Sequence, residues 1–466
     1  MQDSKSYMIR GEKLIKICKD AAFRINKYKV DEFEIFTASS VENEIEIFKG
    51  KIETLSFSDS IGIGIRIFND KSIGYAYTTV LDEASIEDCI RKAVSNCKIT
   101  EREDYNYLPR EEEFTFKQKL ISDKSLFRED FLDYDIESKV TLAKRLETLT
   151  KSKDTRIVDI DNVMYNDSIY ETAILNSAGF CDRYKTTTCF IYVNAISKQN
   201  GDTSTGDFFG CGRAPGDLDL EEVAEKAARR SVSILGGRKI KSQRVDLLLD
   251  PVVSAQLLGI IAGSLTADSV QKRKSLFEGK IGKKIFSIDV NIFDDGTIPD
   301  GLSSKPFDGE GVIKGKTCVF EDGYLKTYLY NTYTARKDKT LSTGNAVRAS
   351  YRSTPEVGIS NFYLEPSDID FSQLLSDIDR GFYIMDIIGL HSGVNSISGQ
   401  MSVGAKGIWI EKGNLEYPVK EVTIATDILS FCKNIKKIGN DLRFIPVGGY
   451  LGSPSLRVRD IMVSGK

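Results

Sequence analysis

Histidine, the side chain most often used for metal binding and for proton transfer near neutral pH, occurs once in the 466 residues, as His391. A zinc helix of the HExxH or HExxxH kind needs two histidines, so this chain cannot supply one. His391 lies in a polar, glycine-rich segment, residues 389–399. If the chain binds a ligand or a peptide, the candidate contacts in this segment are His391, Asn395 and Ser398.

Two carboxylates, Asp308 and Glu310, stand two residues apart in the sequence DGEG. Such a pair could coordinate a cation or act as an acid and a base. Turn formation and exposure to solvent are the usual role of such a sequence, and we favour that interpretation. Gly62 and Gly64 lack the third glycine of a dinucleotide-binding loop, and their segment has the pattern of a strand, so no nucleotide site is expected there.

The eight cysteines include no CxxC pair. In a cytosolic chain such cysteines are most simply reduced and mostly buried, where they act as small hydrophobic side chains. Cys89 and Cys97 support this interpretation, because both fall on the apolar face of a helix predicted over residues 85–97. A catalytic triad would have to use His391 or do without histidine.

The composition is that of a globular protein with room for two or more domains, at 41% hydrophobic and 28% charged residues. A formal charge of −4 gives no reason to expect binding to nucleic acid or to a membrane surface. No apolar run approaches the ~20 residues that cross a bilayer. The first 20 residues lack the core of a signal peptide, so we expect a cytoplasmic protein.

The first half of the chain shows one pattern twice, in which a helix is followed by a strand meander and a second helix. We predict an N-terminal α/β domain over 1–237, with a possible internal repeat of 1–100 and 132–237. An ordinary α+β domain without a repeat is the alternative. The predicted helices are 7–28, 85–97, 134–151 and 220–235, and the predicted strands are 33–37, 44–48, 54–57, 61–68, 72–78, 156–160, 169–175, 180–184, 188–195 and 203–209.

The second half begins with a strand and a helix around which the rest can pack. Residues 245–249 form an apolar run typical of a buried strand. Asp250 can then accept hydrogen bonds from the free N–H groups of a helix, and Pro251 suits its first turn. One face of that helix is apolar at four-residue steps: Val253, Leu257, Ile261 and Leu265.

The remainder is largely β, with strands predicted at 317–320, 324–331, 402–411 and 415–419 and helices at 369–379 and 425–432. The closing stretch, 455–463, alternates like an edge strand. We therefore predict a β-rich, barrel-like C-terminal domain over 238–466 with a few packed helices, and an α+β fold class for the whole chain.

Several segments together resemble the TldD/PmbA family, also called modulators of DNA gyrase. They stand in the family's order and spacing and span nearly the whole chain: GIGIRIFNDKSIGYAYTT, LLLDPVVSAQLLGIIAG, KPFDGEGV, EDGYLKTYLYNTYTARK, SGQMSVGAKGIWIEKGNLEYPVKEVTIA, KIGNDL and SPSLRVRDIMVSG. The resemblance implies a two-domain protein in a cytosolic metalloprotease assembly that acts on small or unfolded peptides. In that family the TldD-type subunit carries zinc on an HExxxH helix, with a cysteine near the C-terminus as a further ligand.

Carried over to this chain, the motif falls on positions that cannot hold the metal. Gly259 takes the place of the first histidine, Ile260 of the glutamate and Ser264 of the second histidine. Residues 440–454 contain no cysteine. The resemblance is thus to the PmbA type, also called TldE, which binds no cofactor itself and works beside a zinc-bearing, TldD-like partner on a peptide substrate.

Three functions remain open at this stage. The first is the non-zinc subunit of a peptidase, with substrate contacts from residues 389–407. The second is a free-standing hydrolase without a metal, using His391 with a serine or cysteine. The third is a binding or scaffold protein without enzymatic activity. We expect the protein to form an oligomer, and the sequence leaves open whether it forms a homodimer in addition to the heteromeric assembly.

Overall fold

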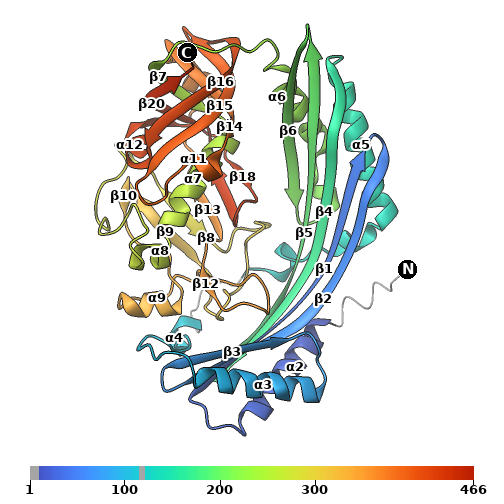
Figure 1. Cartoon of the computed structure of the whole chain (residues 1–466), viewed down its shortest axis with the longest axis vertical. Helices are drawn as coiled ribbons and strands as arrows, with labels where there is room; N and C mark the ends of the chain where they lie inside the picture. The colour runs from blue at the N-terminus through green and yellow to red at the C-terminus, as the bar shows by residue number, and fades with distance from the viewer. Residues whose placement is uncertain (1–9, 115–120, 466) are drawn as a thin grey trace.

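The chain folds into two halves, one built on a long curved sheet and the other on a barrel (Figure 1). The computed structural model describes residues 10–114 and 121–465. The sheet half comprises helices α2–α6 and strands β1–β6, and the barrel half everything from β7 onwards. The predicted α+β class is confirmed, including a barrel in the C-terminal region. Within the described residues no helix is long and apolar enough to cross a membrane.

The sheet half consists of two antiparallel meanders joined edge to edge, in the strand order β3-β2-β1-β4-β5-β6. A helix precedes and a helix follows each meander, as the sequence pattern predicts. The strands are β1 (Glu32–Phe48), β2 (Lys51–Asn69), β3 (Ser72–Thr78), β4 (Ile157–Asn176), β5 (Cys181–Gln199) and β6 (Asp202–Gly212), and the flanking helices are α2 (Arg10–Ile25), α3 (Glu83–Cys97), α5 (Ile136–Ser152) and α6 (Leu220–Val232). Residues 7–9 of the first predicted helix lie outside the described residues.

The predicted pairs of short strands are wrong, because each pair is one long strand. Strand β1, for example, runs through residues 38–43, where the sequence predicts a gap, and pairs there with β2 on one side and β4 on the other. Backbone pairing on both sides satisfies the polar groups of the chain whatever the side chains are. Serine, asparagine and glutamate residues at the surface of the sheet therefore do not interrupt it.

The helices pack on one face of the sheet and leave the other face open towards the barrel half (Figure 1). The first turns of α3, α5 and α6 are capped by aspartates, since Asp82, Asp135 and Asp219 each accept a hydrogen bond from a backbone N–H three residues on. Cys89 and Cys97 are buried on the apolar face of α3, as predicted, and no described cysteine forms a disulfide.

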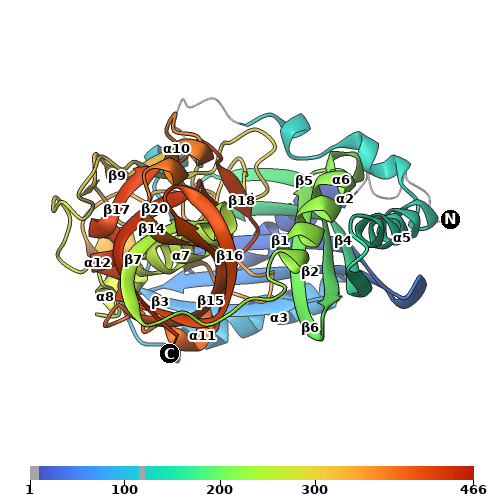
Figure 2. The ribbon, with the colours of Figure 1, turned by 90° about the horizontal axis from the view of Figure 1, so that it is seen from above.

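The barrel closes through the last strand of the chain. Five strands run in the order β16-β15-β14-β7-β20, and a β16–β20 pairing completes the ring that Figure 2 shows from above. The predicted edge strand at 455–463 is therefore wrong, because β20 lies between β7 and β16 and also pairs with β17. The strands are β7 (Gln243–Leu249), β14 (Arg380–Ile388), β15 (Gln400–Glu411), β16 (Asn414–Asp427), β17 (Ile435–Ile438) and β20 (Leu456–Ser464).

A second sheet packs beneath the barrel, with the order β10-β9-β8-β13-β19-β18. The strand predicted at 324–331 is much shorter than expected. The strands are β8 (Ile292–Asp295), β9 (Lys316–Glu321), β10 (Tyr324–Leu325), β13 (Asn361–Leu364), β18 (Arg443–Ile445) and β19 (Tyr450–Ser453), and a separate pair is β11 (Ala346–Val347) with β12 (Glu356–Val357). The short helices are α4 (Glu111–Phe114), α8 (Ala267–Gln271), α9 (Thr332–Lys337), α10 (Phe371–Ser376), α11 (Leu390–Gly393) and α12 (Ile428–Asn434).

Helix α7 (Pro251–Ser264) lies between the barrel and the second sheet and contacts β14, β13, β18 and β19. Its start follows the prediction, since the Asp250 side chain accepts a hydrogen bond from the N–H of Val252, and Pro251 occupies the first turn. The predicted apolar face is buried at Val253, Leu257, Ile261 and Leu265. This helix is the scaffold on which the resemblance places the metal motif. The boundary at 237/238 stays a prediction.

Candidate functional site

Helix α7 offers no ligand atoms at the positions of the zinc motif. Gly259 and Ile260 are partly buried and carry no donor atom for a metal. Ser264 is buried, and its hydroxyl donates a hydrogen bond to the Ile260 carbonyl at 3.2 Å. The residues present therefore do not fit a zinc ion. Over residues 10–114 and 121–465, no group of three or more His, Cys, Asp or Glu side chains could hold a metal ion.

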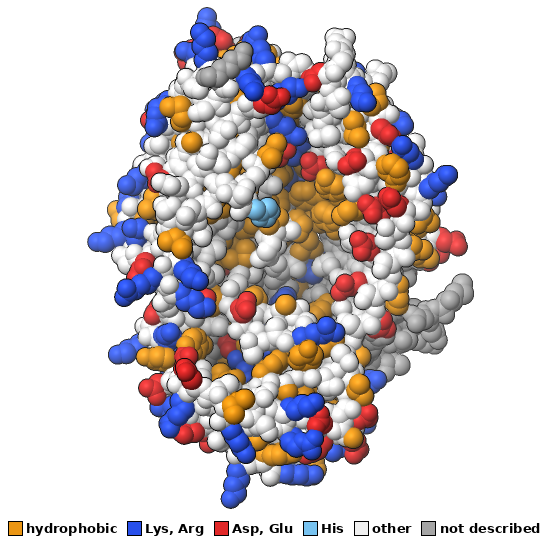
Figure 3. Space-filling view, viewed as in Figure 1, with side chains coloured by type: hydrophobic (Ala, Val, Ile, Leu, Met, Phe, Trp, Pro, Cys, Tyr) orange, Lys and Arg blue, Asp and Glu red, His pale blue; other side chains and the backbone are white. Residues whose placement is uncertain are grey.

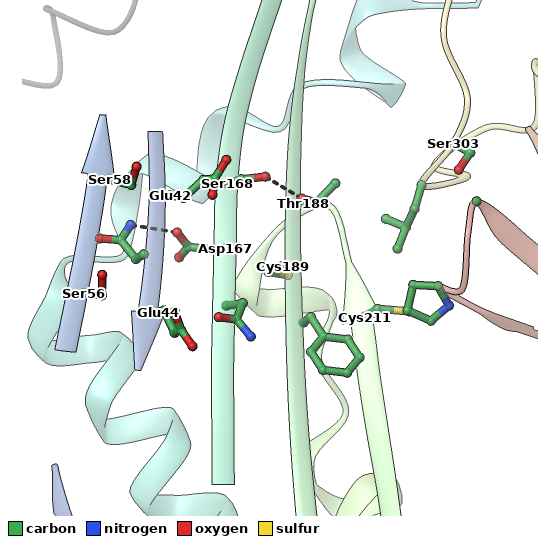
Figure 4. Close-up of a pocket in the computed structure, with 16 residues that line it drawn as sticks. Glu42, Glu44, Ser56, Ser58, Asp167, Ser168, Thr188, Cys189, Cys211 and Ser303 are labelled. Atoms are coloured by element: carbon green, nitrogen blue, oxygen red, sulfur yellow. Dashed lines mark hydrogen bonds between the residues drawn. The ribbon is translucent and has the colours of Figure 1, made fainter. Parts of the chain in front are cut away.

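A cleft of about 730 Å³ opens between the uncovered face of the long sheet and the barrel half. Figure 3 shows the molecular surface hollowed between the two halves. The floor of the cleft comes from β1, β2, β4, β5 and β6, as the close-up in Figure 4 shows. Leu302, Ser303, Pro446 and Gly449 close it from the barrel side.

The register of the sheet arranges the side chains of the floor in two rows. In the first row Glu42 lies between Ser58 and Ser168, and Ser168 is paired with Thr188, to whose hydroxyl it is hydrogen-bonded at 2.8 Å. The second row lies two residues along each strand and therefore on the same face. Its members are Ser56, Glu44, Asn166, Phe190 and Cys211. The floor is thus made mainly of hydroxyl, amide and carboxylate groups.

The two exposed carboxylates of the cleft are Glu42 and Glu44, and no ion pair joins either to another described residue. Asp167, by contrast, is buried and bound by Lys139 at 2.6 Å and by the Tyr165 hydroxyl at 2.7 Å. Burial, and then Asp167, raises the pKa of Tyr165, which therefore stays a proton donor. No Lys or Arg is among the described residues that line the cleft, so it favours cationic or hydrogen-bonding ligands.

Two cysteines also line the cleft, but neither is an activated nucleophile. Burial raises the pKa of Cys189 and of Cys211 above the usual value of 9.0. The Cys211 sulfur lies 3.7 Å from the Tyr450 hydroxyl, and no carboxylate, histidine or lysine side chain of a described residue is hydrogen-bonded to it. Both side chains are therefore thiols at neutral pH, whereas a cysteine nucleophile needs the thiolate.

The three substrate-binding candidates lie on one exposed loop of the barrel half. His391 is in the short helix α11 and makes no hydrogen bond or ion pair with another described residue. Asn395 accepts hydrogen bonds from the N–H groups of Ile397 and Ser398, so it builds the turn. Figure 3 shows the single histidine near the central hollow. Of the three, only Asn395 lines a shallow depression of this loop, and a role in binding stays a prediction.

Residues 400–407, which we grouped with this loop, belong to strand β15. Their backbone is paired with β14 and β16, and a role in substrate contacts stays a prediction.

The exposed, solvated role expected for Asp308 and Glu310 is wrong, although the turn is present. Both side chains are 2% exposed and lie at the boundary between the two halves. Glu310 accepts hydrogen bonds from Arg66 of β2 and from the N–H of Thr332. Asp308 accepts hydrogen bonds from three backbone N–H groups, those of Glu310, Val312 and Ala346.

The partners of this turn were missed by sequence reasoning. Arg66 also binds Glu34 of β1 at 2.8 Å, and Glu34 in turn pairs with Arg348 of the barrel half. One signal was available, since Glu34 and Arg66 are single charges inside otherwise apolar strand segments. A buried charge in such a place needs a partner, which the sequence alone does not identify.

Comparison with known proteins places this geometry among the PmbA/TldA metallopeptidases. Family profiles match for domain 1 over residues 33–97, the central domain over 129–235 and the C-terminal domain over 242–465. Metalloprotease PmbA of Escherichia coli O157:H7 is 27% identical over 439 residues, covering 92% of each chain.

Two solved structures are also similar. A proposed modulator of DNA gyrase from Thermotoga maritima is 28% identical, with a TM-score of 0.87 over 96% of this chain and 99% of that one. TldE from Thermococcus kodakarensis is similar in fold, with a TM-score of 0.84 at 20% identity over 97% and 99% of the two chains.

Proposed function

Because the chain belongs to the PmbA/TldD metallopeptidase family, we propose that it is the PmbA/TldE-type subunit of a two-component peptidase, in which a TldD-like partner carries zinc and performs hydrolysis. One observation carries the proposal: Gly259, Ile260 and Ser264 leave helix α7 without a ligand or a general base. Family membership without the metal residues is best explained by a subunit that serves a catalytic relative. We expect the assembly to act in the cytoplasm.

In this role the chain holds the substrate. The cleft floor presents two rows of mainly polar side chains, one containing Glu42 and the other Glu44. These side chains can donate hydrogen bonds to the backbone of an extended peptide and accept hydrogen bonds from it. Unfolded chains suit such a site, since their N–H and C=O groups are free. Neither cysteine among the described residues of the cleft is an activated nucleophile, because burial keeps Cys189 and Cys211 as thiols.

The experiment mixes this chain with a zinc-bearing, HExxxH relative from the same cell and follows cleavage of a dye-labelled unstructured peptide. We expect no cleavage and no stoichiometric zinc for this chain alone, and a gain in kcat/KM when both are present. Unchanged activity of the relative would contradict the proposal. If the two chains bind one another without any gain, the scaffold function is favoured instead.

A variant that fills the cleft tests the substrate role separately. Ser168→Tyr places a large side chain on the floor, whereas Ser152→Tyr places the same side chain at the exposed end of α5. We expect the first to raise KM of the mixed assembly and the second to leave it unchanged. Equal KM values for the two variants would show that the substrate does not bind in the cleft.

The free-standing hydrolase is not favoured by the geometry. His391 has no described carboxylate, serine or cysteine in hydrogen-bond contact, so a triad is not assembled around it. Chelator-resistant activity of the purified chain, lost in His391→Ala, would establish that function in place of the subunit role.

A further inference from the structure

A second cavity, of about 480 Å³, lies between helix α6 and the barrel half. We call it the α6 pocket. Its sides come from α6, the start of α7, α10 and strands β14, β15 and β16. The cleft and the α6 pocket share no lining residue in the described part of the chain, so the two are separate sites.

One side of the α6 pocket is apolar. Met385 is buried at its base, and the rings of Phe371 and Tyr383 meet edge to face with 5.2 Å between centroids. Leu415 is 42% exposed at the mouth. An aliphatic group of a few carbons can be buried against these side chains, which removes its apolar surface from water. The buried ring of Phe208 belongs to the other side, because Lys226, Arg230 and Arg443 lie over it.

The other side is cationic, with Lys226, Arg229, Arg230 and Arg443. Two carboxylates line the pocket among the described residues, and both are already engaged. Asp250 forms an ion pair with Arg230 at 2.8 Å and accepts a hydrogen bond from the Tyr383 hydroxyl. Asp441 accepts hydrogen bonds from the backbone N–H and from the hydroxyl of Ser455.

A third carboxylate, Glu222, is shared by two of the cations. Lys226 lies 2.9 Å from it, and Arg443 donates to it as well. The Arg229 side chain, on the same face of the pocket, makes no ion pair or hydrogen bond with another described residue. Three of the four cations thus pair with Asp250 or Glu222, and the cation that pairs with no carboxylate among the described residues is Arg229, whose planar, bidentate guanidinium suits a carboxylate ligand.

We propose that the α6 pocket binds a carboxylate carried on a small aliphatic group, with Arg229 holding the anion and Met385, Phe371 and Leu415 holding the aliphatic part. Two sources share this chemistry: the C-terminal residue of a peptide and a free aliphatic acid. The inference goes beyond the subunit role, because it needs neither zinc nor a partner chain.

The test is isothermal titration of the purified full chain at neutral pH with N-acetyl-leucine, N-acetyl-leucinamide and isocaproate, each up to about 10 mM. We expect the acids to bind at least tenfold more tightly than the amide, because the amide offers no charge to Arg229. Tighter binding of N-acetyl-leucine indicates a peptide C-terminus, and tighter binding of isocaproate a free acid. Equal affinities of acid and amide, or no binding of either acid, would overturn the proposal.

Arg229→Gln is the deciding variant, and Arg145→Gln, an exposed position on α5, is its matched control. Both side chains are at the surface, so both variants are expected to keep the melting temperature of the parent. We expect Arg229→Gln to weaken the binding of N-acetyl-leucine at least fivefold, and Arg145→Gln to leave the affinity for N-acetyl-leucine unchanged. Equal affinities of the two variants would refute the assignment of Arg229.

Discussion

Arg66 of β2 and Glu310 of the barrel half face each other across the boundary between the two halves, with 3.2 Å between guanidinium nitrogen and carboxylate oxygen. Their side chains are 7% and 2% exposed. Glu34 accepts a hydrogen bond from the same guanidinium and pairs in turn with Arg348. These contacts tie the long sheet to the barrel half.

Removing Arg66 is expected to destabilise the protein strongly. Arg66→Met leaves Glu34 and Glu310 buried without their shared cation, which costs about 3–5 kcal/mol of unfolding free energy. Arg102→Met is the control, because its ion pair with Asp70 is exposed at 61% and 65% and contributes about 0–1 kcal/mol. Urea denaturation of both variants measures the difference. Similar losses for the two would show that the buried pair does not stabilise the protein.

The stability of the protein should fall as the pH rises from about 4 to about 7. Burial, and then the neighbouring Glu310 carboxylate, raises the pKa of Asp308 from 3.8 to about 7. The folded state therefore binds a proton in this range that the unfolded state has lost, and its advantage disappears as the pH passes the folded pKa.

Asp308→Asn should flatten this pH dependence, since the amide does not titrate. The comparison uses the slope of unfolding free energy against pH, because the amide also disturbs the hydrogen bonds from Glu310, Val312 and Ala346. Asp70→Asn, at an exposed position, should keep the slope of the parent. An unchanged slope in Asp308→Asn would assign the pH dependence to other groups.

The cap of helix α7 should matter more than an ordinary helix cap. Asp250→Ala removes the cap and also leaves Arg230, whose side chain is 11% exposed, without its carboxylate. We expect a loss of about 2–4 kcal/mol. Asp82→Ala removes only the cap of α3 and should cost about 1 kcal/mol. Thermal and urea unfolding measure both, and equal losses would limit the role of Asp250 to capping.

His391→Ala should leave the stability of the chain within about 0.5 kcal/mol, because the side chain is exposed and makes no contact that the fold depends on. If its loop contacts substrate, KM of the mixed assembly rises while kcat stays unchanged. Steady-state kinetics separate the two parameters. A large fall in kcat would instead assign His391 to the chemistry.

Local patterns in the sequence were sufficient to predict the class of fold and several of its helices and strands. The aspartate and proline before α7, the apolar steps along it and the helix–meander–helix order all appear in the structure, since each depends on residues close in the chain. The single histidine already excluded a zinc helix in this chain. The family resemblance, carried by ordered segments over the whole length, was equally available.

Only the tertiary structure decided the rest. Arg66 and Glu310 are 244 residues apart, so no local sequence pattern links them. The turn that contains Glu310 therefore looks exposed in the sequence, although in the structure it is buried against strand β2. Strand β1 is one continuous strand, where the sequence suggested two, because β2 and β4 pair with it on both sides. Strand β20 is an inner strand because β16 pairs with it and closes the barrel. The cleft and the α6 pocket likewise lie between elements distant in sequence. Spacing along the chain determines helices, caps and missing ligands, whereas burial and charge pairing depend on which surfaces meet after folding.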